Sequence, residues 1–297
     1  MWKRYFAVTS LAEALQLLAE YQTQARIIAG GTDLLIELER GQRPGVEVLV
    51  DVSRVPGLDH AWRHADEIRF GPLFTHNHAV ASPFIVQEGL PLAQAAWEVG
   101  APQIRNRGTI VGNLITASPA NDTITPLMAL DASLTLKSLR GERQLSLRDF
   151  YQGYRQTALQ PDEMVTEVRF PALQSHEAGF FLKLGLRRAQ AISVLNIAVV
   201  VGFEDPADRR SPLTRVSLAL GCVAPTIIRL PEVEAQLLGQ SLTEATPCPG
   251  SSRRHADSAT HQRCPQYRPL SLGDGWCVPA TRAANPVSGR RTPALPS

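Results

Sequence analysis

The chain has 297 residues, 44% of them hydrophobic, and its 30 Lys and Arg against 28 Asp and Glu give a formal net charge of +2. This length favours two domains with a sizeable core, and the composition excludes a chain that is disordered throughout. A charge so nearly balanced does not point to nucleic acid as a partner, and no basic run is interleaved with aromatic residues.

No segment has the length and apolarity of a membrane span. The longest nearly apolar run, residues 189–203, is interrupted by Gln190, Ser193 and Asn196. It is shorter than the roughly 20 apolar residues that a membrane helix needs. The N-terminus also lacks the apolar core of a signal peptide. We therefore expect a cytoplasmic protein without a membrane span, or one that is exported on a partner.

The first 60 residues show the pattern of a small parallel α/β unit. Ser10 and Glu13 form a capping box before a helix predicted over residues 11–21, where leucines recur at helical spacing. A short strand over 26–29 is followed by the turn Gly30-Gly31-Thr32-Asp33, a helix over 34–40 and an apolar strand over 46–52. A strand, turn, helix and strand in this order predict parallel pairing.

Residues 53–120 have a more broken pattern, and further elements follow as far as residue 170. The sequence predicts strands over 67–71, 133–138 and 164–170, helices over 90–99 and 123–130, and a β-rich fragment over 109–111. His76 and His78 have strand-like spacing, but no third ligand is evident. A solvent-facing pair or a turn is therefore a better explanation than zinc.

A boundary is predicted near residue 175. Three long strands over 180–186, 192–203 and 215–223 predict an antiparallel sheet, and a helix follows over 231–238. We divide the chain into a first domain over 1–174, a second over 175–242, and a tail over 243–297.

The tail has a different composition from the rest of the chain. Residues 243–297 contain 8 Pro, 7 Arg and 3 Cys but no Ile, Phe, Met or Lys. Their net charge is +4, so the remainder of the chain carries −2. We expect disorder here, either as a genuine extension or as the product of a shifted reading frame that leaves the second domain incomplete at its C-terminus.

Two segments have the residue types of a ligand site. The first is Ile27-Ile28-Ala29-Gly30-Gly31-Thr32-Asp33-Leu34, where backbone N–H groups between a strand and a helix suit a phosphate. The alternative is a plain turn in which Thr32 or Asp33 caps the helix. The second runs over 109–113 and 116–123 and is rich in hydroxyl and amide donors. Its alternative is a loop whose Asn121 or Asp122 caps the next helix.

Taken together, these segments resemble the FAD-binding (medium) subunit of the molybdenum hydroxylases, the group of aerobic carbon monoxide dehydrogenase and xanthine dehydrogenase. The matching stretches are AGGTDLL at 29–35, QIRNRGTIVGN at 103–113, TASPAND at 116–122, GYRQT at 153–157, and Lys183 with residues 187–196. The resemblance covers residues 1–240, and its motifs are long and in the same order.

The resemblance implies an α+β fold and a role. A two-lobed FAD-binding domain of the PCMH type would precede a smaller domain with a three-stranded antiparallel sheet and helices. Electrons would pass from a large molybdenum-cofactor subunit to a small [2Fe-2S] subunit and from there to FAD. FAD would then pass them to NAD or another acceptor. The four cysteines offer no set for an iron–sulfur cluster, which agrees with clusters on a partner.

The family pattern also implies which residues bind FAD. It places one group around the diphosphate and ribose and a second group beside the cofactor, and it assigns no catalytic or metal-binding residue. The implied residues are Ile27, Ile28, Ala29, Gly30, Gly31, Thr32, Asp33 and Leu34 in the first group, and Val99, Thr109, Ile110, Val111, Gly112, Asn113, Ser118, Asp122, Val165 and Lys183 in the second. For Lys183, a solvated lysine on a strand remains the alternative.

One position departs from the family pattern. The family has two adjacent glycines where this chain has Val111 and Gly112. If that position needs a positive φ or a close approach of the flavin, a β-branched residue costs about 1–3 kcal/mol and weakens FAD binding. The second hypothesis for the chain is therefore a flavin-free assembly or remnant subunit that only docks to partner chains.

Overall fold

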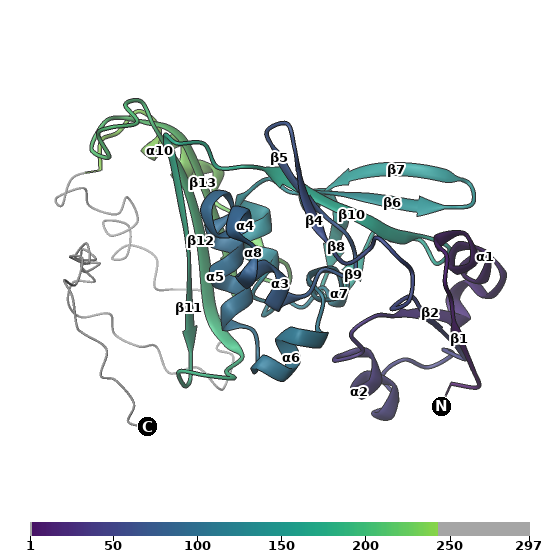
Figure 1. The fold of residues 1–297 in the computed structure, drawn as a ribbon. Helices are drawn as coiled ribbons and strands as arrows, with labels where there is room; N and C mark the ends of the chain where they lie inside the picture. Colours follow the sequence, from purple (N-terminus) through teal and green to yellow (C-terminus); the bar gives the residue numbers. More distant parts are fainter. Residues whose placement is uncertain (1, 243–297) are drawn as a thin grey trace, which may run out of the picture. The chain divides into compact units, whose positions relative to one another are not determined.

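The computed structural model describes residues 2–242, so the expectations for the tail over 243–297 lie outside the described residues. The α+β class is confirmed, and helices and sheets alternate along the chain (Figure 1). The first lobe contains β1 (Arg4–Ala7), α1 (Leu11–Tyr21), the 3-10 helix η1 (Gln22–Gln24), β2 (Ala25–Ile28), α2 (Leu34–Glu39) and β3 (Val48–Asp51). Its three strands form a parallel sheet in the order β1-β3-β2.

This lobe follows the sequence pattern closely. Helix α1 has the predicted bounds, and its buried Leu15 and Leu18 pack in a small core with the valines of β3. Ser10 caps the helix by accepting from the Glu13 backbone N–H at 3.2 Å. Glu13 reaches back to the N–H of Thr9 instead of Ser10, so the capping box is displaced by one residue. Strand β1 was not predicted, because Tyr5 and its exposed neighbours give no apolar alternation.

The second lobe begins with a hairpin and a run of short helices. It contains β4 (Ala61–His64), β5 (Glu67–Phe70), α3 (His76–Ala81), α4 (Pro83–Glu88), α5 (Leu90–Glu98), α6 (Pro102–Arg107), α7 (Ile110–Thr116) and α8 (Ile124–Ala129). It continues with β6 (Ser133–Ser138), β7 (Gly141–Ser146), α9 (Leu147–Phe150), β8 (Tyr151–Gly153), β9 (Gln156–Thr157) and β10 (Met164–Pro171). Five of these strands form an antiparallel sheet in the order β4-β5-β10-β6-β7.

Two sequence predictions in this lobe are wrong. The β-rich fragment at 109–111 forms only an isolated β-bridge, between Thr109 and Thr75, and is otherwise the cap and first turn of helix α7, because the Thr109 hydroxyl accepts from the Gly112 N–H at 2.9 Å. This local cap outweighs the strand preference of three β-branched residues. His76 and His78 lie on helix α3 rather than on a strand or turn, and only His78 faces solvent.

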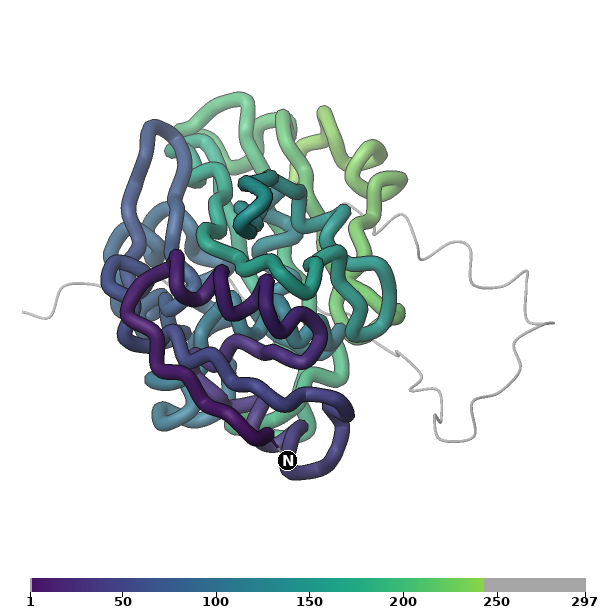
Figure 2. The backbone as a smooth tube through the Cα atoms, turned by 90° about the vertical axis from the view of Figure 1, so that its right-hand side faces the viewer, coloured from purple at the N-terminus to yellow at the C-terminus, as the bar shows by residue number. Residues whose placement is uncertain are grey.

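The last part of the described chain forms an antiparallel sheet. It contains β11 (Glu177–Gly185), β12 (Ser193–Phe203), β13 (Leu213–Gly221) and β14 (Ile228–Arg229), followed by α10 (Pro231–Leu237). The three predicted long strands are present, and the two-residue β14 extends the sheet. Helices α5 and α8 pack against one face of the sheet, and α10 packs against β13. Figures 1 and 2 show this sheet on the side of the described chain away from the purple N-terminal lobe.

The largest core includes residues from both sides of the predicted boundary at residue 175. Phe181, Ala198 and Ala219 from the last sheet are buried in the same cluster as Leu92 and Leu127 from α5 and α8. The division of the chain at 174 and 175 stays a prediction.

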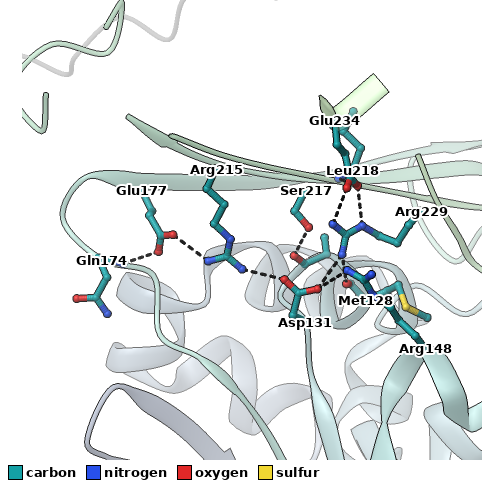
Figure 3. Close-up of polar contacts among 11 residues, drawn as sticks. Met128, Asp131, Arg148, Gln174, Glu177, Arg215, Ser217, Leu218, Arg229 and Glu234 are labelled. Atoms are coloured by element: carbon teal, nitrogen blue, oxygen red, sulfur yellow. Dashed lines mark hydrogen bonds and ion pairs between the residues drawn. The ribbon is translucent and has the colours of Figure 1, made fainter. Parts of the chain in front are cut away.

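A charged network crosses the same junction (Figure 3). Asp131, in the turn after α8, is within ion-pair distance of Arg148, Arg215 and Arg229. Arg215 also pairs with Glu177, and Arg229 pairs with Glu234 of α10. Side chains of β11, β13, β14 and α10 are therefore joined to the end of α8 and to α9.

Within residues 2–242, no helix combines the length and apolarity needed to cross a membrane. The same residues hold no group of three or more His, Cys, Asp or Glu side chains that could bind a metal ion.

Candidate cofactor site

A cavity of about 630 Å³ brings the two predicted segments together. This volume lies within the range of small-molecule and cofactor sites. Fifteen of the eighteen predicted site residues line it, although they come from distant parts of the sequence: residues 27–34, Val99, Thr109, Val111, Gly112, Asn113, Asp122 and Val165. The other three lie elsewhere. Ile110 is buried in the core, and Ser118 accepts from the Ala120 N–H in the loop after α7. Lys183 forms an ion pair with the cavity residue Asp122 without lining the cavity itself.

The backbone geometry of the turn at residues 30–33 requires its two glycines. Gly31 has a φ of +72°, in the left-handed region that other residues avoid. At Gly30, a side-chain carbon would lie 2.1 Å from the carbonyl oxygen of Arg107. The turn therefore lies directly against the end of α6. These two glycines are needed to bring the first segment against the second, whatever ligand the cavity holds.

The expected strain at Val111 is absent. Val111 lies in the first turn of α7 and has no positive φ. Its side chain is buried in the main core while also lining the cavity. A positive φ at Val111 is therefore excluded as a cause of weakened FAD binding, whereas a close approach of the flavin to this position stays a prediction.

Polar groups of α7 are oriented by hydrogen bonds. The Asn113 side-chain oxygen accepts from the Thr123 hydroxyl at 2.6 Å, which leaves the amide nitrogen as the donor toward the cavity. The Thr116 hydroxyl lies 3.2 Å from a carboxylate oxygen of Asp33, at the start of α2. Asp33 occupies the N-cap position of α2, as the alternative expected, but its side chain makes no capping hydrogen bond.

Lys183 and Asp122 form a buried ion pair next to the cavity. The ammonium nitrogen lies 2.6 Å from Asp122 Oδ2 and donates to the Glu98 carbonyl at 3.1 Å, while the Ser193 hydroxyl donates to Asp122 Oδ1 at 2.6 Å. The Lys183 and Asp122 side chains are only 5% and 8% exposed. Both alternatives, a solvated Lys183 and an Asp122 cap on α8, are therefore wrong. Burial raises the pKa of Asp122 above its ordinary value and outweighs the opposing effects of Lys183 and Ser193.

One end of the cavity carries positive charge that the motifs did not indicate. Arg26 and Arg43 line this end, and so does Arg155 from the turn between β8 and β9. Buried Glu37 accepts from Arg43 at 2.8 Å and from Arg155 at 3.1 Å. Burial lowers the pKa of Arg26, and the charge of Arg43 lowers it further. Arg43 and Arg155 both pair with Glu37, whereas Arg26 donates to the Thr23 and Ala25 carbonyls, and the fold brings the three arginines together.

His76 is a further cavity residue that the motifs missed. Its side chain is buried, it lines the cavity, and its Nδ1 has no hydrogen-bond partner. The sequence signal for this residue was the His-x-His pattern, and interpreting that pattern as the spacing of a strand was incorrect.

The residues present fit a flavin dinucleotide. Such a ligand needs donors for two phosphates, polar partners for its hydroxyl groups and apolar surface for its rings. The cavity offers backbone N–H groups at the glycine turn, hydroxyl and amide groups on α7, arginines at one end, and Val99 and Val165. His76 adds a buried polar side chain to this lining.

Two family models match the chain. One, described as the FAD binding domain in molybdopterin dehydrogenase, matches residues 2–173. The other, described as the CO dehydrogenase flavoprotein C-terminal domain, matches residues 180–249.

Similar proteins span most of the chain. The nicotinate dehydrogenase FAD-subunit of Eubacterium barkeri is 38% identical over 82% of this chain and 81% of its own length. The carbon monoxide dehydrogenase medium chain of Hydrogenophaga pseudoflava is 32% identical over 81% of each chain. A solved carbon monoxide dehydrogenase from Hydrogenophaga pseudoflava, which lacks the Mo-pyranopterin moiety of the molybdenum cofactor, superimposes with a TM-score of 0.77, at 30% identity and over 82% of this chain and 83% of its own.

Proposed function

Because the chain belongs to the FAD-binding subunits of the molybdenum hydroxylases, we propose that it is the electron-transfer subunit of such a complex. Electrons would arrive from iron–sulfur clusters on a partner and leave to NAD or another acceptor. When bound, FAD supplies the redox chemistry, and the protein supplies binding, orientation and electrostatics. The observation that carries the proposal is the single cavity lined by both motif segments.

The proposed roles of the cavity residues follow from their chemistry. The turn at 27–34 offers N–H groups to the diphosphate, as helix and turn N–H groups do in other phosphate sites. Thr109 and the Asn113 amide offer hydrogen bonds, while Val99 and Val165 offer apolar surface to the rings. Lys183 acts on the cavity through Asp122, to which it is bound, rather than by direct contact.

The proposed partners are a large molybdenum-cofactor subunit and a small [2Fe-2S] subunit. The similar proteins are named as FAD-subunits, medium chains and subunits of dehydrogenases. Cys222 is the only cysteine among residues 2–242, so this part of the chain cannot supply the four thiolates of an iron–sulfur cluster. The cytoplasmic location expected from the sequence stays a prediction.

The experiment is a flavin measurement on the purified full-length chain. We expect a yellow protein whose flavin absorbance bleaches when reduced partner subunits are added and returns with NAD or another acceptor. The Asn113→Ala variant should bind FAD about tenfold more weakly, because it loses a polar partner of the ligand. Asn77→Ala is the matched control, since Asn77 is exposed on α3 and does not line the cavity.

Two other results would contradict the proposed function in whole or in part. A folded, colourless protein that takes up no FAD but still binds partner chains would support the flavin-free assembly subunit instead. Bound FAD that neither gains electrons from a partner nor passes them on would contradict the electron-transfer role while leaving FAD binding intact.

A further inference from the structure

His76 lies where the two motif segments meet. It is the first residue of helix α3, and its backbone N–H donates to the Gly108 carbonyl at 3.1 Å. Two residues away, the Ile110 N–H donates to the Phe74 carbonyl at 3.0 Å. These bonds join the start of α3 to the segment that begins α7. The side chain of His76 is 2% exposed, so its position is set by the fold and not by solvent.

The imidazole shares a small space with the glycine turn. A side-chain carbon added at Gly108 would lie 3.3 Å from His76 Cδ2 and 3.5 Å from the Thr32 hydroxyl oxygen. The ring edge next to Nε2 and the hydroxyl of the turn therefore approach the same point. A ligand atom held by the turn at Thr32 would come within reach of that edge of the ring.

The other ring nitrogen is complementary to Arg105. His76 Nδ1 and Arg105 Nε are both buried, and neither has a hydrogen-bond partner. The two side chains come from packed helices, α3 and α6, and the charge of Arg105 acts on the imidazole. No hydrogen bond joins the two atoms in the structure, but Arg105 Nε can only donate, so a neighbouring Nδ1 is better suited as an acceptor than as a second donor. The proton of a neutral imidazole then resides on Nε2, next to the cavity.

The ring is neutral in the folded protein. Burial lowers the pKa of His76 to about 4, and the charge of Arg105 contributes to this shift. A neutral ring has one donor and one acceptor, so fixing Nδ1 as the acceptor also fixes the character of Nε2.

We propose that His76 is a further FAD-binding residue, which donates a hydrogen bond from Nε2 to an oxygen of the FAD diphosphate. The inference deepens the proposed function and rests on it, because it takes the cavity at 27–34 and 109–113 as the FAD site.

The test compares three substitutions at one position in the full-length chain freed of flavin. Gln places an amide nitrogen near the position of Nε2, Asn places one near Nδ1, and Phe keeps the ring without polar atoms. We expect His76→Phe and His76→Asn to weaken FAD binding by about tenfold or more, and His76→Gln by no more than about threefold. Flavin fluorescence quenching gives the dissociation constants. His78→Gln, on the exposed side of α3, is the matched control and should match the parent.

Two fragments of FAD locate the contact. ADP contains the diphosphate, whereas riboflavin contains the ring and no phosphate. We expect His76→Phe to weaken ADP binding as much as FAD binding and to leave riboflavin binding unchanged. Equal weakening of riboflavin, or unchanged binding of FAD and ADP, would overturn the proposal. If His76→Phe fails to fold, as thermal unfolding without FAD would reveal, the Gln and Asn variants carry the same comparison.

A parent chain that binds no FAD would remove the proposed function itself. A parent that binds FAD, with Asn113→Ala weakened and His76→Phe unchanged, would remove only the role of His76.

Discussion

Two aspartates near the last sheet differ in how deeply they are buried and in how many cations they contact. Asp122 has a single cation, Lys183, and its side chain is 8% exposed. Asp131 is 39% exposed and has three cations, Arg148, Arg215 and Arg229 (Figure 3). Their pKa values shift in opposite directions.

The difference shows which effect wins at each site. At Asp122, burial raises the pKa and outweighs Lys183, Ser193 and their hydrogen bonds. At Asp131, burial also raises the pKa, but the charges and hydrogen bonds of Arg229 and Arg148 outweigh it. A single cation does not compensate for the loss of water at the buried Asp122, whereas several cations do so at the partly exposed Asp131. We therefore expect Asp122 to depend on one partner and Asp131 to tolerate the loss of any one.

The largest effect is expected from Lys183→Met. The substitution leaves the Asp122 carboxylate buried beside the cavity with no cation, which typically destabilises a protein by about 3–5 kcal/mol. Urea unfolding of the full-length chain would measure the loss. Adding Asp122→Asn to the same variant should recover part of it, because the unpaired charge is then gone.

Lys137→Met is the matched control for this prediction. Lys137 pairs with Glu142 at 3.7 Å, and both side chains are well exposed. Its loss should change stability by less than about 0.5 kcal/mol. Equal losses for the two lysines would contradict the contrast between buried and exposed pairs.

The second largest effect is expected from Arg229→Met. Arg229 donates twice to Glu234, at 2.7 and 3.0 Å, and once to Asp131 at 2.8 Å. Asp131 keeps its two other arginines, so the loss falls mainly on the bidentate pair with Glu234, a loss of about 1–3 kcal/mol. The unfolding free energy should fall by less than in Lys183→Met. A larger fall would mean that Asp131 depends on Arg229 alone.

These pairs also mark the limit of what the sequence predicts. Lys183 and Asp122 both belonged to the predicted site, but their contact joins residues 61 positions apart and depends on how β11 packs beside α5. The arginines around Asp131 had no motif at all. Local patterns placed α1, β6 and the long strands of the last sheet well, since apolar spacing marks these elements.

The errors lie where short elements depend on distant contacts. Apart from α5, the helices within residues 53–120 have only six or seven residues, too short for a clear period. Thr109 and Val111 have strand propensity, but a cap and the pairing of Ile110 with Phe74 produce a helix. His76 was missed for the same reason, because its burial comes from helices that the pattern did not reveal.

The contributions of the two aspartates to stability should change with pH in opposite directions. Because the pKa of Asp122 is raised, the folded protein keeps a proton that the unfolded chain has lost. The stabilisation of the folded protein by this proton is present below pH 3.8 and is lost as the pH rises through the raised value. The lowered pKa of Asp131 gives a contribution that is present above 3.8 and lost as the pH falls through the lowered value. Unfolding curves of Asp122→Asn and Asp131→Asn against the parent across this acid range should show opposite slopes. Equal slopes would contradict the comparison.

The smallest effect is expected from Arg148→Met. Arg148 lies 2.6 Å from Asp131 Oδ1, the shortest of the three arginine contacts, but its side chain is 53% exposed. Water screens the pair, and Asp131 keeps Arg215 and Arg229, so the loss should stay below about 1 kcal/mol despite the short distance. Urea unfolding against Arg229→Met makes the measurement. If Arg148→Met cost more than Arg229→Met, distance rather than exposure would rank these pairs, and the contrast between Asp122 and Asp131 would need a different cause.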